Sequence, residues 1–124
     1  MKIRIKGNSV RIRLGKSEVD SFAETGEVSE SNDFGGGNLL RYSLQKSATG
    51  ESLSAKFDSN VITLYMPENL LHEWATTERV GFDANMPIGN GSNLFLLVEK
   101  DWKCLDTTNE DQSDMFANPN EACG

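Results

Sequence analysis

The first 14 residues, MKIRIKGNSVRIRL, alternate apolar and basic side chains on both sides of a Gly-Asn pair. Strict alternation is typical of a strand with one buried face, and a Gly-Asn pair between two such strands predicts a tight hairpin. With this pair at the turn, Ile5 faces Val10. Arg4 then faces Arg11, so the apolar side chains lie on one face and the basic side chains on the other.

The segment LSAKFDSNVITLYM, residues 53–66, repeats the pattern with Ser59 and Asn60 at the turn. Helical spacing of apolar residues follows each hairpin, in 16–26 and in 67–77. Four further strands are expected in 27–31, 38–46, 79–86 and 93–100. The order strand-strand-helix-strand-strand therefore occurs twice, which we interpret as an internal repeat of residues 2–46 and 53–101.

One constant offset places apolar residues of the first half on apolar residues of the second, for example Val10 on Ile62 and Val28 on Val80. After a two-residue insertion in the glycine-containing loops, Tyr42 falls on Leu96. The predicted fold class is α+β: a curled antiparallel sheet or barrel of about eight strands with two helices. We expect a single domain over residues 1–105 and an acidic polar tail over residues 106–124.

The chain has a net charge of -7, yet six of its 12 cations lie in the first 16 residues. We expect a basic strand face to bind an anionic ligand through Lys6, Arg11, Arg13, Arg41 and Lys56. Three sources of counter-charge are open: water and salt, acidic residues of the chain itself, and a polyanionic ligand. The internal candidates are Asp83, Glu99 and the tail.

Evidence for catalytic chemistry in the sequence is poor. The only histidine, His72, lies beside the apolar stripe of the second helix, where an exposed or core-rim imidazole is expected. Cys104 and Cys123 are expected to be free thiols, and no metal site or cofactor is predicted. The GGGN stretch at 35–38 lacks the Gly-Lys-Ser/Thr ending of a phosphate-binding loop.

The expected surroundings of the protein follow from composition. No stretch approaches the roughly 20 apolar residues of a membrane span, and we expect neither a secretory signal nor membrane association. The predicted location is the cytoplasm. The overall acidity disfavours nucleic acid, so a small anionic or polyphosphate ligand is the expected partner. The sequence leaves the oligomeric state open.

The runs IRIKGNSVRIRLGKSEV, VEKDWKCLD and EDQSDMFANPN resemble a family of small, uncharacterised bacterial proteins over most of the chain. That resemblance implies no activity. The expected topology is similar to that of the triphosphate tunnel (CYTH-like) proteins, which hold polyphosphates in a charged barrel with a divalent metal and begin with a Glu-x-Glu-x-Lys strand. Here Lys6 matches the lysine, whereas Lys2 and Arg4 replace both metal-binding glutamates.

Two function classes, with a third reading beside them, follow from these observations. We expect a non-catalytic binding module for a phosphate-bearing or other anionic ligand, rather than an enzyme. The alternative is a diverged, metal-dependent phosphohydrolase of the tunnel type, with Glu99 and Asp83 as its metal ligands. The third reading is a self-associating protein whose acidic tail docks on the basic face of another copy.

Overall fold

The structure, a computed structural model, describes residues 1–102. Eight strands and two helices follow one another in the order strand-strand-helix-strand-strand, twice, as predicted, and the α+β class is confirmed. The expected tail at residues 106–124 lies outside the described residues. The elements are β1 (Lys2–Lys6), β2 (Ser9–Leu14), α1 (Lys16–Thr25), β3 (Glu27–Asp33), β4 (Leu39–Ser47), β5 (Ser54–Asp58), β6 (Val61–Pro67), α2 (Glu68–Thr76), β7 (Gly81–Gly89) and β8 (Ser92–Lys100).

The strands form two four-stranded sheets, in the orders β1-β2-β8-β7 and β3-β4-β6-β5. This corrects the expected single antiparallel sheet or barrel, because β2 pairs with β8 and β4 with β6 in parallel. Each sheet, called here the first and the second, combines one hairpin from each half of the chain. Alternation of side chains determines the face on which a residue lies but not which strands are neighbours, so the parallel contacts were not predicted.

The two sheets have equivalent registers. Val10 pairs with Leu96 in the first sheet, and Ile62 pairs with Tyr42 in the second, as the predicted alignment of the halves requires. One step of that alignment is wrong, because Phe82 rather than Val80 has the position equivalent to Val28. The two-residue insertion therefore lies between α2 and β7 and not in the glycine-containing loops. Descent of the two halves from a duplication stays a prediction.

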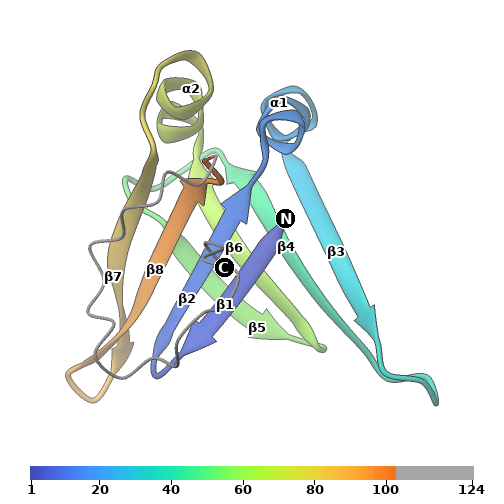
Figure 1. Cartoon of the computed structure of the whole chain (residues 1–124). Coiled ribbons are helices and arrows are strands. Elements are labelled where there is room, and N and C mark those ends of the chain that lie inside the picture. Colours follow the sequence, from blue (N-terminus) through green and yellow to red (C-terminus); the bar gives the residue numbers. More distant parts are fainter. Residues whose placement is uncertain (103–124) are drawn as a thin grey trace, which may run out of the picture.

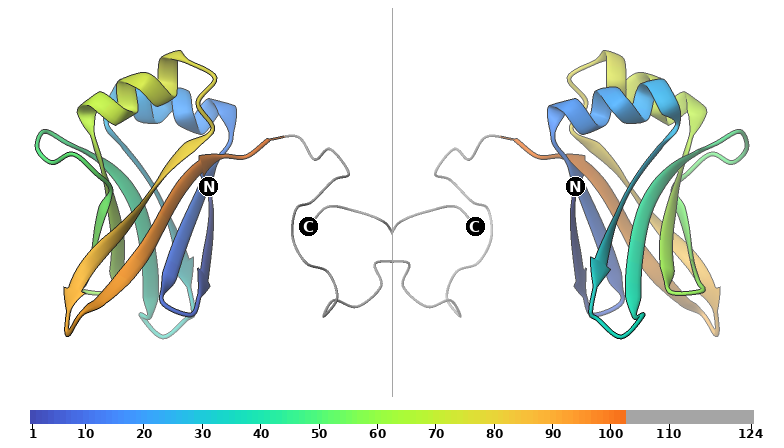
Figure 2. Two further views of the ribbon diagram at one scale, coloured as in Figure 1. Left: turned by 90° about the vertical axis from the view of Figure 1, so that its left-hand side faces the viewer. Right: turned by 90° about the vertical axis from the view of Figure 1, so that its right-hand side faces the viewer.

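Both helices lie side by side across one end of the two sheets, and the four hairpin turns lie at the opposite end (Figures 1 and 2). Phe22 of α1 and Trp74 of α2 are fully buried and meet edge to face, with ring centroids 6.3 Å apart. The Trp74 indole N–H donates to the Val80 carbonyl oxygen at 2.8 Å. The helices therefore close one end of the core. Its other buried members include Val10, Ile12, Leu14, Val19, Leu44, Leu53, Leu64, Met66, Leu71, Phe82, Leu96 and Val98.

The sheets diverge toward the hairpin turns (Figure 1). Gly7, the first central residue of the β1–β2 turn, has φ 55°, a conformation that glycine adopts without the steric cost of a side chain. At this end the apolar faces are incompletely covered: Ile5 is 58% exposed and Phe57 is 68% exposed.

Candidate functional site

The outer face of the first sheet carries five cations on two neighbouring strands. Lys2, Arg4 and Lys6 come from β1, and Arg11 and Arg13 come from β2; together they are called the basic face. Arg4 lies directly opposite Arg11, and Lys2 lies opposite Arg13, as the hairpin pattern predicted. Like charges in these positions destabilise a strand pair unless counter-charges are near.

Glu99 of β8 supplies a counter-charge to two of these cations. The parallel pairing of β2 with β8 places Glu99 beside Arg13 in register. The Arg13 Nε–H donates to Glu99 Oε1 at 2.6 Å, and Arg11 Nε lies 3.9 Å from the same oxygen. The Glu99 side chain is only 17% exposed, so one partly buried carboxylate serves two arginines.

Asp101 neutralises a third cation. Its carboxylate lies 2.9 Å from Lys2 Nζ, and that hydrogen bond holds the pKa of Asp101 below its ordinary value. Acidic residues of the chain itself, one of the three possible sources of counter-charge, therefore neutralise part of the basic face. Arg4 and Lys6 differ: within residues 1–102, no carboxylate lies within ion-pair distance of either side chain.

Gly81 of β7 allows β7 to approach β8 closely beside Glu99. It pairs with Glu99 across the two strands, and a Cβ atom at Gly81 would lie 2.1 Å from the Val98 carbonyl oxygen. Any side chain here would push β7 away from β8 and displace the Glu99 backbone. We missed this role in the sequence, although a glycine at the start of an apolar strand can signal close backbone approach.

Arg41 and Lys56, the other two predicted site residues, lie on the outer face of the second sheet. Their neighbours there include Ser43 and Thr63, whose hydroxyl groups are 3.4 Å apart and buried. The apolar inner faces of the two sheets face each other, so this surface and the basic face lie on opposite sides of the molecule. The expected five-residue ligand site is thus divided, because the prediction assumed a single sheet.

The five cations of the basic face lie on the outside of the first sheet, and the space between the sheets is filled mainly by apolar residues. This arrangement differs from a charged tunnel. Asp83 of β7 is exposed and pairs in register with Leu97, while Glu99 is held by Arg13. Among residues 1–102 no three His, Cys, Asp or Glu side chains group as metal ligands would.

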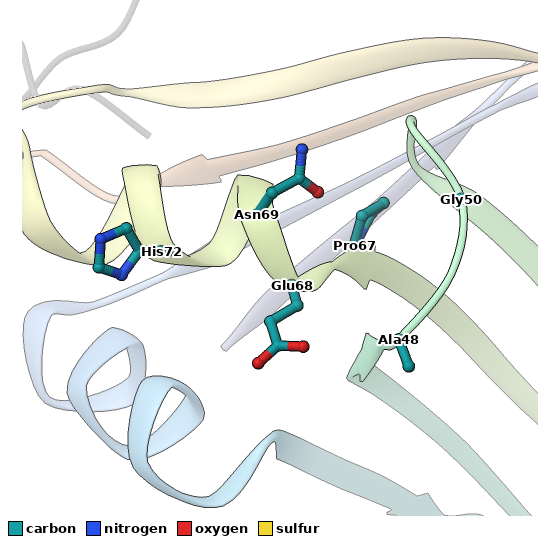
Figure 3. Close-up of a pocket in the computed structure, with 6 residues that line it drawn as sticks. All are labelled: Ala48, Gly50, Pro67, Glu68, Asn69 and His72. Carbon is teal, nitrogen blue, oxygen red and sulfur yellow. The ribbon is translucent and has the colours of Figure 1, made fainter.

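A cavity of about 540 Å³ lies at the start of α2, beside the loop between β4 and β5 (Figure 3). His72 is exposed there, as expected, and Glu68 lies one helical turn before it. Figure 3 shows Glu68, Asn69 and His72 pointing in different directions, so their polar groups do not converge on one point. A smaller cavity of about 270 Å³ is lined by apolar residues such as Leu14 and Trp102 together with charged residues such as Lys16 and Asp101.

The start of β1 is anchored to two other elements. The α-amino group of Met1 donates to Glu18 of α1 and, at 3.0 Å, to Glu30 of β3. Burial alone would raise the pKa of Glu18, but the bonds from Met1 and from the Gly15 N–H, at 2.9 Å, outweigh burial and lower it. Burial and a hydrogen bond to Glu30 raise the pKa of Tyr42. These contacts fix the position of the strand that carries Arg4 and Lys6.

A family model described as a family of unknown function, DUF7009, matches residues 1–120. No curated protein and no solved structure matches the chain. The expected uncharacterised family is confirmed, whereas neither the bacterial origin nor the likeness to tunnel enzymes gains support from these comparisons. Neither helix among the described residues is long and apolar enough to cross a membrane.

Proposed function

The chain belongs to the DUF7009 family of unknown function, and we propose from its own side chains that it is a non-catalytic module that binds an anionic partner on the basic face. One observation carries the proposal. Five cations lie on two adjacent strands, and within residues 1–102 the acids in ion-pair contact with them include Glu99 and Asp101, while Arg4 and Lys6 have none within ion-pair distance there. In an acidic chain, this local excess of positive charge would attract an anion.

The geometry favours anion binding at the part of the basic face near the β1–β2 turn. Arg13 is held by Glu99 and Lys2 by Asp101, so these two cations have partners already. Arg4 and Lys6 are exposed and have no carboxylate within ion-pair distance in the described part of the chain. We therefore assign the first contacts with the anion to Arg4 and Lys6, with Arg11 beside them. The bacterial origin and cytoplasmic location expected from the sequence are part of this proposal.

The test compares two variants with the same change in charge on opposite faces. Arg4→Gln/Lys6→Gln removes two cations from the basic face, and Arg41→Gln/Lys56→Gln removes two from the outer face of the second sheet. Thermal unfolding is followed with and without tripolyphosphate, at low and at high salt. Tripolyphosphate should raise the melting temperature of the wild type and of the second variant, because binding to the native state stabilises it. The first variant should gain little.

Two results would contradict the proposal. One is an equal loss of stabilisation in both variants, which would mean that tripolyphosphate responds only to net charge. The other is release of phosphate from tripolyphosphate with Mg²⁺ or Mn²⁺, lost in Glu99→Gln, which would favour the phosphohydrolase alternative. The reading in which the acidic tail docks on a second copy concerns residues 106–124, outside the described residues.

A further inference from the structure

β1 is an edge strand of the first sheet, with β2 on one side and no other strand of residues 1–102 beyond it (Figure 1). In a hairpin with a two-residue turn, the residues that flank the turn exchange backbone hydrogen bonds, and the bonded positions then alternate. The observed register therefore directs the backbone groups of Lys2, Arg4 and Lys6 toward β2. The N–H and C=O groups of Ile3 and Ile5 point to the open edge.

We propose that the anionic partner is an extended acidic peptide that adds to β1 as a fifth strand of the first sheet. This inference rests on the proposed function and specifies its ligand. Two N–H donors and two C=O acceptors, from Ile3 and Ile5, are available to such a strand. Edge addition of this kind draws its affinity from backbone hydrogen bonds and its specificity from alternate side chains.

The side chains of β1 define the sequence that fits. Lys2, Arg4 and Lys6 lie on the outer face, so an added strand places acidic side chains opposite them. Ile5 lies on the other face and is 58% exposed, so an apolar side chain beside it would cover surface that is now in water. The partner is therefore an alternation of acidic and apolar residues about five residues long, the length of β1.

A second copy of the chain is a poorer occupant. Two antiparallel β1 strands would place cations opposite cations, which destabilises strand pairing. Cations on an edge strand can also serve only to prevent such pairing. That purely protective role is the competing explanation, and it predicts that no strand adds to β1. The anchoring of Met1 by Glu18 and Glu30 keeps the edge ordered before a partner arrives.

The test uses labelled, end-capped pentapeptides with the full chain, and reads binding by fluorescence anisotropy. Glu-Val-Glu-Val-Glu matches β1. Glu-Glu-Val-Val-Glu has the same composition without the alternation, and a version of the first peptide N-methylated at both valines cannot donate to the edge. The matching peptide should bind about tenfold more tightly than either control. The N-methylated peptide loses two backbone hydrogen bonds to the edge, and the peptide without alternation loses the pairing of its carboxylates with the cations of β1.

Ile5→Pro is the matched protein variant. It removes one N–H from the open edge, whereas the bonds of β1 to β2 come from other residues. It should weaken the matching peptide about tenfold and leave stabilisation by tripolyphosphate unchanged. If this variant does not fold, the N-methylated peptide on the wild type decides the question.

Equal binding of all three peptides, or no binding of any, would overturn this inference. If tripolyphosphate still stabilises the wild type through Arg4 and Lys6, the proposed function stands and the partner is a compact anion. If neither peptide nor tripolyphosphate has an effect, both proposals fail and the cations only protect the edge.

Discussion

Neutralising two arginines of the same strand pair should change stability in opposite directions. Arg13→Gln removes a hydrogen bond between a guanidinium and a carboxylate that is 17% exposed, at 2.6 Å. Because the Arg13 side chain is itself 34% exposed, solvent screens part of the interaction with Glu99. We therefore expect the free energy of unfolding to fall by about 1–2 kcal/mol. Arg4→Gln removes a like-charge contact with Arg11 and should gain about 0.2–0.5 kcal/mol at low salt.

The assay is thermal unfolding of both variants at low salt and in 1 M salt. For a domain of about 100 residues, 1 kcal/mol corresponds to roughly 4–8 °C, so Arg13→Gln should melt about 4–16 °C lower and Arg4→Gln about 1–4 °C higher. The gain in Arg4→Gln should vanish in 1 M salt, where charges are screened over about 3 Å. Much of the Arg13→Gln loss should persist, because its two groups are in direct contact.

A double-mutant cycle isolates the pair. Glu99→Gln combined with Arg13→Gln should show a coupling free energy of about 1 kcal/mol. Once one side chain of the pair is replaced, replacing the other no longer removes the bond between them. An Arg13→Gln variant that melts at or above the wild-type temperature would refute the reasoning, because the bond to Glu99 would then contribute nothing. Arg41→Gln, on the opposite face, is the control and should change the melting temperature little.

Three further changes test other parts of the structure. Trp74→Ala should cost about 3–5 kcal/mol of unfolding free energy in denaturant titrations, because it leaves a cavity between the helices and removes the bond to the Val80 carbonyl; a loss under 1 kcal/mol would mean that the helices do not depend on this contact. Gly81→Ala should destabilise more than Gly15→Ala, since neither glycine has a positive φ and a Cβ at Gly15 would meet nothing closer than Glu18 Oε1 at 3.6 Å; equal effects in circular dichroism melts would mean that the close approach of β7 to β8 is unimportant. Because its pKa is lowered on folding, Glu18 contributes stability above its unfolded pKa, and that contribution is lost as pH falls through the folded pKa. Glu18→Gln should therefore lose less stability than the wild type in melts between pH 6 and about pH 2.5, and identical profiles would contradict the role of Glu18.

Much of the local structure could be predicted from residue patterns. The alternation around the Gly-Asn turn predicted the pairing of Arg4 with Arg11 and of Ile5 with Val10, and both pairs are observed. Helical spacing of apolar residues predicted helices in 16–26 and 67–77, and the observed helices bury Phe22 and Trp74. These features depend on neighbours in the chain, so a short stretch of sequence contains the information that determines them.

The composition of the site was harder to predict because it depends on contacts between distant segments. Glu99 lies beside Arg13 only because β8 pairs in parallel with β2, and no local pattern indicates that pairing. For the same reason the prediction put Arg41 and Lys56 on one face with Lys6, Arg11 and Arg13, whereas they lie on the second sheet.

The exchange of hairpins between the sheets has a consequence for the order of folding. Ser9 pairs with Phe95 and Arg41 with Val61, so the inner strand of each hairpin bonds to a strand from the other half. During synthesis the second edge of β2 can form its backbone hydrogen bonds only after β8, almost 90 residues later in the chain, has been made. Such distant contacts predict slow folding for a chain of this size. They also mean that fragments 1–47 and 53–102 should be poorly structured alone and should assemble with each other when mixed, each supplying half of both sheets.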